Sequence, residues 1–162
     1  MDCPLGGEKL FSGRIYDEDG DGENVDIKGG DGYFIAAGVV TPMNISDNVE
    51  TQFTIGWKAK GITADDGKVT FHRIPLEALI FAKQEKFRIG GGLTYHLNPE
   101  LSGHGSVGAA DFSFDNALGF IVEADYLVSI IQIGVRGSFI TYKKDGVEID
   151  GNGIDIVTSF RF

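Results

Sequence analysis

A run of acidic residues near the start of the sequence has the composition of a cation-binding loop. Residues 17–23 read Asp-Glu-Asp-Gly-Asp-Gly-Glu, so carboxylates alternate along a stretch in which glycine permits a sharp turn. Alternate carboxylates that converge on a hard cation are typical of Ca²⁺ and Mg²⁺ sites. The candidate Ca²⁺ ligands in this loop, residues 17–26, are Asp17, Asp19, Asp21 and Glu23. Lys28 stands where an EF-hand has a bidentate glutamate, so an EF-hand is excluded, and a solvated acidic loop is the alternative.

The overall composition excludes several classes of protein. The chain has 162 residues, a length that predicts one domain over residues 1–162. Its formal net charge of −10 argues against nucleic-acid binding, which requires a basic surface. No apolar run reaches the ~18 residues that a membrane-spanning helix needs. The single cysteine, Cys3, cannot form an internal disulfide.

Alternation of apolar and polar residues predicts β-strands along the whole chain. We expect eight strands, at residues 8–16, 32–41, 50–60, 68–82, 86–96, 116–126, 129–143 and 152–162. Long polar or glycine-rich loops are predicted at 17–31, 61–67, 97–115 and 144–151. Shorter turns are predicted at 41–49, 83–85 and 126–128, and the parity of the apolar residues changes across the last of these. Long loops on one rim and short turns on the other are typical of membrane β-barrels.

The polar face of these strands carries charges of both signs together with several glycines. The charged residues predicted on this face are Arg14, Lys58, Arg73, Glu77, Arg88, Glu123, Asp125, Arg136, Asp155 and Arg161. Such a mixture favours a paired network inside a narrow barrel, because a buried unpaired charge is very costly. Small glycines beside large side chains suit an eight-stranded lumen. The alternative is a soluble barrel or sandwich, in which the charged face meets water and the apolar face forms the core.

Four stretches of the chain resemble the small eight-stranded outer-membrane barrels of the OmpA transmembrane-domain and OmpX type. They are residues 71–77 (FHRIPLE), 90–95 (GGGLTY), 119–124 (GFIVEA) and the terminal Phe160-Arg161-Phe162. The resemblance implies an all-β, eight-stranded antiparallel up-and-down transmembrane β-barrel in the outer membrane of a Gram-negative bacterium, with both termini periplasmic. It also implies that Phe160 and Phe162 form the aromatic C-terminal signal that the barrel assembly machinery reads.

A second, weaker resemblance concerns catalysis. His104-Gly105-Ser106, followed by Glu123, is similar to the catalytic residues of outer-membrane lipid A deacylases, in which serine attacks an ester with histidine as base. The surrounding motif of that family is absent, and Glu123 is predicted in the lumen, far from a loop that contains His104. The sequence therefore favours a protein that is not an enzyme.

These expectations together define a function. We expect a monomeric, non-enzymatic barrel with a structural or surface-interaction role, in contact with outer-membrane lipid and lipopolysaccharide through acidic extracellular loops. No cofactor is expected other than Ca²⁺ in loop 17–26. Two alternatives stay open: a small-solute or ion channel through the charged lumen, and an enzyme that modifies lipid A. Barrels of this kind share a fold without sharing a function.

Overall fold

The structure is a computed structural model that describes residues 9–16, 22–28, 32–43, 48–64, 67–105 and 111–161. Its elements in these ranges are β-strands joined by turns and short irregular segments. Every pair of neighbouring strands is antiparallel. The protein is therefore all-β and antiparallel, as the alternation in the sequence predicts.

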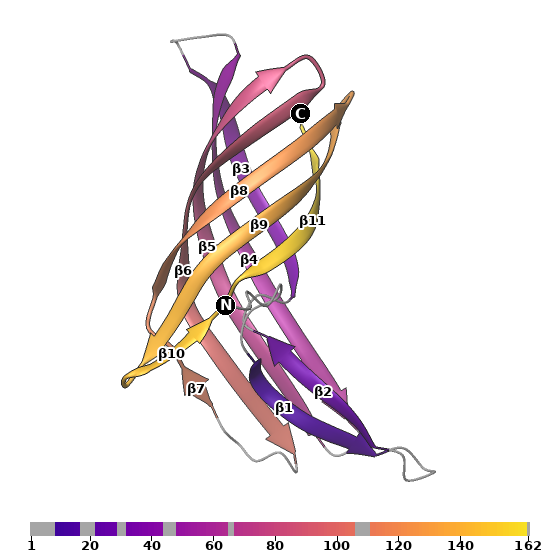
Figure 1. The fold of residues 1–162 in the computed structure, drawn as a ribbon, viewed down its shortest axis with the longest axis vertical. Helices are drawn as coiled ribbons and strands as arrows, with labels where there is room; N and C mark the ends of the chain where they lie inside the picture. The colour runs from indigo at the N-terminus through magenta and orange to yellow at the C-terminus, as the bar shows by residue number, and fades with distance from the viewer. Residues whose placement is uncertain are drawn as a thin grey trace, which may run out of the picture.

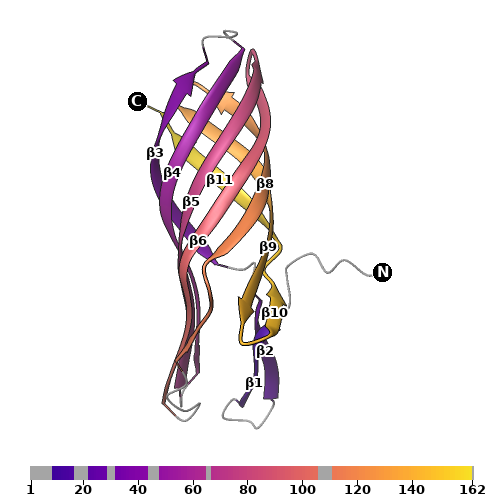
Figure 2. The same ribbon diagram turned by 90° about the vertical axis from the view of Figure 1, so that its left-hand side faces the viewer.

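Most of the described chain forms one nine-stranded sheet. Its long strands are β3 (Tyr33–Pro42), β4 (Val49–Ala64), β5 (Gly67–Gln84), β6 (Phe87–Gly105), β8 (Ala117–Val128), β9 (Ile131–Lys144) and β11 (Gly153–Phe160), in that order across the sheet. Two short strands complete it: β7 (Phe112–Ser113) pairs with β6, and β10 (Val147–Asp150) pairs with β9. The connections run up and down, and the sheet curls into a half-barrel (Figures 1 and 2).

One end of this half-barrel, which we call the short-turn rim, carries the connections β3–β4, β5–β6 and β8–β9 (Figure 1). The last two are two-residue turns in which Glu85 and Ser129 adopt a positive φ, at 50° and 58°. Such left-handed residues allow a tight reversal between twisted strands. The second turn, at 129–130, lies just beyond the predicted 126–128. The apolar exposed residues are even-numbered before it, as at Phe120, and odd-numbered after it, as at Val135.

The opposite end, which we call the extended end, differs from the sequence prediction. Residues 61–67 and 97–105 were expected in loops, but β4 continues to Ala64 and β6 to Gly105. Residues 144–151 likewise contain β10, which forms a hairpin with β9. These strands are stabilised here by a small buried cluster from β5, β8, β9 and the segment before β8. Its members are Val69, Phe71, Phe114, Ala117, Ile140 and Tyr142.

The N-terminal strand is also placed differently from the prediction. β1 (Lys9–Tyr16) is a strand, but it pairs with β2 (Gly22–Lys28) in a separate two-stranded sheet. Residues 22–28 were predicted as part of loop 17–31, although residues 24–28 alternate as Asn-Val-Asp-Ile-Lys. The alternation covers only five residues and directly follows a run of glycines and acidic residues, which predicts a loop. The curled sheet therefore has seven long strands, because β1, which was predicted as the eighth strand of the barrel, belongs to the separate sheet.

The two faces of the curled sheet differ sharply in chemistry. In β8, Phe120 and Val122 are exposed on the convex outer face, whereas Glu123 and Asp125 are buried on the concave inner face. The same alternation places large apolar side chains outside on the other strands. They include Ile35, Ile55, Trp57, Ile80, Ile89, Leu93, Val135, Phe139 and Ile156. The half-barrel is thus apolar outside and charged inside.

Candidate functional site

The charged interior of the half-barrel is assembled by strand register. Residues of like parity face inward along a strand, so charges on neighbouring strands become direct cross-strand partners. Arg88 on β6 lies opposite Asp125 on β8, and Glu123 on β8 lies opposite Arg136 on β9. The antiparallel pairing of neighbouring strands therefore by itself places opposite charges side by side.

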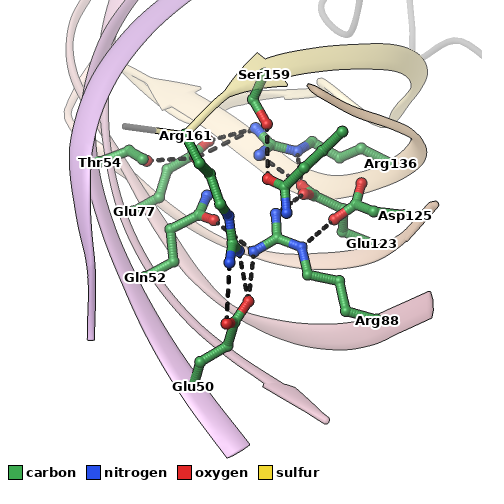
Figure 3. Close-up of polar contacts among 11 residues, drawn as sticks. Glu50, Gln52, Thr54, Glu77, Arg88, Glu123, Asp125, Arg136, Ser159 and Arg161 are labelled. Atoms are coloured by element: carbon green, nitrogen blue, oxygen red, sulfur yellow. Dashed lines mark hydrogen bonds and ion pairs between the residues drawn. The ribbon is translucent and has the colours of Figure 1, made fainter. Parts of the chain in front are cut away.

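Arg88 is the centre of this network and is only 2 % exposed (Figure 3). Its Nη1 donates hydrogen bonds to Oε1 of Glu50, at 3.1 Å, and to Oε1 of Gln52, at 2.9 Å. Its Nε donates to Asp125, and its Nη2 lies 3.3 Å from Glu123. The guanidinium also stacks 3.8 Å from the centre of a neighbouring phenylalanine ring. One cation therefore binds three carboxylates from two other strands.

Arg136 forms a second centre beside the first. Its Nε and Nη2 both lie 2.6 Å from Oε2 of Glu123, and its Nη1 donates to both carboxylate oxygens of Glu77, at 2.9 and 3.2 Å. Thr54 donates a further bond of 2.7 Å to Glu77. Because Glu123 contacts both arginines, the two centres form one continuous network across the interior (Figure 3).

Two ion pairs connect β4, which lies next to one edge of the sheet, with the other edge, at β11 and the residue that follows it. Arg161 contacts both carboxylate oxygens of Glu50, at 2.5 and 3.0 Å. Nζ of Lys58 donates to Oδ2 of Asp155 at 2.9 Å. These strands are not neighbours in the sheet, so the two ion pairs cross the interior and hold the sheet in its curled shape.

The buried charges are balanced in sign. Four buried cations and four buried carboxylates occur among the described residues: Lys58, Arg73, Arg88, Arg136, Glu50, Glu77, Glu123 and Asp125. Pairing of this kind offsets the cost of removing each charge from water. The interior of the half-barrel therefore holds a charge-balanced, paired network, and Arg88, Glu123 and Arg136 of this network also line a cavity of about 680 Å³.

The structure brings together nearly all of the residues that the sequence assigned to the lumen. Arg73 is buried there too, with its guanidinium 4.5 Å from the centre of the Phe71 ring. Arg14 lies in β1, and its side chain is outside the described part of the structure. Glu50 and Gln52 were not assigned to the network. Their even numbers match that of Lys58 on the same strand, and that parity would have identified both.

The other predicted sites are less complete. Asp17, Asp19, Asp21, Ser106 and Phe162 lie outside the described residues. Glu23 belongs to strand β2 and not to a loop, and the side chains of β2 are likewise not described. Within the described residues, no three histidine, cysteine or carboxylate side chains form a group able to hold a metal ion.

The residues proposed for catalysis or assembly have the following places. His104 lies near the end of β6, at the extended end. Glu123 is in the interior, bound to Arg88 and Arg136, so its carboxylate is already engaged in ion pairs. Phe160 is exposed on the outer face of β11.

The extended end has its own polar features. Nδ1 of His96 and the hydroxyl of Tyr142 are hydrogen-bonded at 2.7 Å, and both side chains are buried. Several acidic residues in this region are exposed to solvent. They are Asp111, Asp115, Asp145 and Glu148. The hairpin between β9 and β10 and the segment before β8 thus present these carboxylates to solvent at the extended end.

Comparison with known proteins identifies no relative. No family model, no curated protein and no solved structure matches the chain. In the part of the chain that the structure describes, no helix is long and apolar enough to cross a membrane.

Proposed function

We propose that this protein is an outer-membrane β-barrel of a Gram-negative bacterium, with eight strands when closed. Its role in this proposal is structural or surface-interacting and does not include catalysis. The single observation that carries the proposal is the reversal of the usual faces, with apolar side chains exposed outside and charges buried inside. In a membrane barrel the outer face meets lipid and the inner face is polar.

The outer face supports this placement by its extent. Ile89 is 67 % exposed and Ile156 is 82 % exposed, and comparable side chains cover every long strand of the half-barrel. Soluble monomers rarely expose a contiguous apolar surface of this size, because leaving it in water is unfavourable. Lipid contact removes that cost. These exposed apolar side chains, which we call the apolar band, therefore mark the part of the barrel that would cross the hydrocarbon core.

The inner face supports a barrel that does not conduct. The interior of eight strands is just wide enough for side chains to fill. Here Arg88 and Arg136 bind carboxylates from three strands, β4, β5 and β8, which places a charge-balanced network in the interior. We therefore assign the charges to stability and closure rather than to an ion path.

The extended end supports a surface role. β4, β5 and β6 continue beyond the apolar outer face. A buried cluster that includes Phe71 and Tyr142 packs β5 and β6 against β8 and β9 there. A firm framework of this kind can hold the exposed carboxylates in place. In the outer membrane these would face lipopolysaccharide phosphates bridged by divalent ions, or a basic partner.

The first experiment is electrophoresis of detergent-folded protein with and without boiling, together with its solubility in plain buffer. A heat-dependent change in mobility and a need for detergent are expected. If the protein instead stays monodisperse without detergent, the membrane proposal is wrong, and the apolar face must be covered in another way.

Conductance in planar bilayers tests the interior network. We expect no single-channel events for the folded wild-type protein, and openings when Arg88 and Arg136 are both replaced by alanine. Steady conductance of the unchanged protein would favour the channel alternative over a structural role.

Lipopolysaccharide binding tests the surface role. The variant D111N/D115N/D145N/E148Q, folded in detergent and titrated in the presence of Mg²⁺, should bind lipopolysaccharide several-fold more weakly than the wild type. Glu85→Gln, at the short-turn rim, is the matched control and should bind normally. Equal binding by all three proteins would show that the acidic residues of the extended end make no contact.

A further inference from the structure

The curled sheet has two unpaired edges that face each other. Within the described residues, β3 pairs with β4 alone and β11 pairs with β9 alone. A cavity of about 680 Å³ opens along the gap between them, which we call the seam, and extends inward to Arg88 and Arg136. β3 contributes Ala36 and Gly38 to its lining, and β11 contributes Val157 and Ser159. The cavity is lined both by inward-facing side chains, such as Asp155, and by outward-facing ones, such as Ile156.

The direction of the strands shows why the seam cannot close by itself. The long strands alternate in direction across the sheet, and β3 and β11 both run toward the short-turn rim (Figures 1 and 2). Direct pairing of these two edges would be parallel, whereas the pairs among the described strands are antiparallel. One additional strand that runs away from the short-turn rim would pair antiparallel with both edges.

A membrane makes the seam untenable. Unpaired backbone N–H and C=O groups find no water in the hydrocarbon core, and open sheet edges do not occur there. β3 and β11 expose 10 and 8 residues of edge, respectively. If the proposed function is correct, a strand must therefore fill the seam in the bilayer.

We propose that β1 leaves β2 and inserts between β3 and β11, which closes an eight-stranded barrel in the membrane. This inference rests on the proposed function and adds the segment and the rearrangement that complete the barrel. β1 has 8 residues, the same length as β11. It precedes β3 in the chain, and residues 17–32 connect the two, so an antiparallel hairpin of β1 with β3 is sterically accessible.

The sequence of β1 suits both faces of the seam. Phe11 and Ile15 share one parity, and Ser12 and Arg14 share the other. The first pair would join the apolar outer band, and the second pair would face the polar interior. Ala36 and Gly38 on the inner side of β3 are small, which leaves room for a long cation. In an antiparallel register that sets Ser12 beside Val157, Arg14 comes beside Asp155.

The two arrangements of β1 exclude each other. In the separate sheet, β1 pairs with β2 in the register Ser12 to Asp26. In the closed barrel both edges of β1 are used, so no edge is left for β2. Exchange between the hairpin and the barrel is therefore a switch that membrane insertion would drive.

Disulfide cross-linking distinguishes the two arrangements. In a Cys3→Ser background, Ser12→Cys is combined in turn with Ala36→Cys or Val40→Cys on β3, with Val157→Cys on β11, and with Asp26→Cys on β2. Arg14→Cys with Ala36→Cys is a third β3 pair, which covers the register that sets Ser12 beside Gly38. Gly38 is avoided because a Cβ there would collide with the carbonyl oxygen of Phe53. Disulfides form only when Cα atoms approach within about 4.4–6.8 Å, so each pair reports one neighbour.

The variants are folded into phospholipid vesicles, oxidised, and separated on gels with and without boiling. We expect one β3 pair and the β11 pair to cross-link within a single chain at least tenfold more than the Asp26 pair. The inference is overturned by a dominant Asp26 pair, by cross-linking to only one edge, or by no cross-link at all. Products of twice the mass would show that a second copy supplies the strand, which also overturns it.

The heat-dependent mobility of the same samples separates this inference from the function on which it rests. A protein that inserts and shifts on boiling, yet retains the Asp26 cross-link, would leave the membrane barrel standing and remove β1 as its closing strand. A protein that neither inserts nor shifts would remove both.

Discussion

Replacement of Arg88 by methionine tests whether the interior network stabilises the barrel. Methionine keeps an unbranched side chain that can still cover the Phe81 ring, which the guanidinium now contacts at 3.8 Å. The change removes only the cation and its hydrogen bonds. Glu50, Glu123 and Asp125 would then remain in the interior without the group that binds all three.

The expected loss of stability is large because the site is closed to solvent. The side chain of Arg88 is 1 % exposed, and the side chains of Glu123 and Asp125 are 3 % and 2 % exposed. Removal of one partner from a buried ion pair typically costs about 3–5 kcal/mol, because an uncompensated charge is left behind. With a urea dependence of about 2 kcal/mol/M, the unfolding midpoint should fall by roughly 2 M.

A surface ion pair on the same protein is the matched control. Lys143 lies 2.5 Å from Glu148, and the two side chains are 60 % and 61 % exposed. Lys143→Met also removes one cation from an ion pair, but exposed pairs contribute only about 0–1 kcal/mol. Urea unfolding of detergent-folded protein can be followed through Trp57, the single tryptophan. A loss of less than about 1 kcal/mol for Arg88→Met, similar to the control, would refute the assignment of the network to stability.

A double variant checks the reason for the loss. Without Arg88, Glu50 still contacts Arg161 and Glu123 still contacts Arg136, whereas Asp125 loses its ion pair. Asp125→Asn added to Arg88→Met removes that charge, so it should restore part of the stability. A coupling of about 0.5–3 kcal/mol is expected for two groups in direct contact. Strictly additive losses would show that the two side chains act independently, against the geometry of their hydrogen bond.

Three further substitutions probe other parts of the molecule. Gly134→Ala should destabilise the barrel by about 1–3 kcal/mol in urea unfolding, because a Cβ there collides with an interior carboxylate, whereas Gly137→Ala on the same strand should be tolerated. Val122→Lys, on the outer face, should cost about 2–4 kcal/mol in lipid vesicles if that position lies near the bilayer midplane; improved solubility in plain buffer with no loss of stability would contradict lipid contact. Tyr142→Phe should cost about 1–3 kcal/mol by leaving His96 without its buried partner, and an unchanged melting temperature would show that the bond is dispensable.

The sequence alone was sufficient to place the seven long strands of the curled sheet and to assign their two faces. Side chains alternate between faces of a strand with a period of two, so the local pattern around Phe120 and Glu123 predicts the burial that the structure shows. The change of parity between β8 and β9 was also visible, because a two-residue turn reverses the chain without disturbing either pattern. The membrane location and the surface role remain predictions.

The extent of the strands was not visible in the same way. Residues 97–105 are rich in glycine and polar side chains, which predicts a loop, yet β6 continues through them to Gly105. The reason is tertiary, since β5 pairs with β6 along this whole stretch and packs Phe71 against Tyr142. Favourable packing between distant segments therefore produces a strand here, although the local strand propensity is low.

The choice of partners was decided by the tertiary structure alone. The sequence supplies cations and carboxylates of the right parity, but parity says only that they share an interior. Arg161 binds Glu50, which is 111 positions away in the chain, because curling of the sheet brings β11 across from β4. The place of β1 has the same origin. Its alternation predicts a strand wherever it pairs, and only the edges available to it determine whether it completes a hairpin or a barrel.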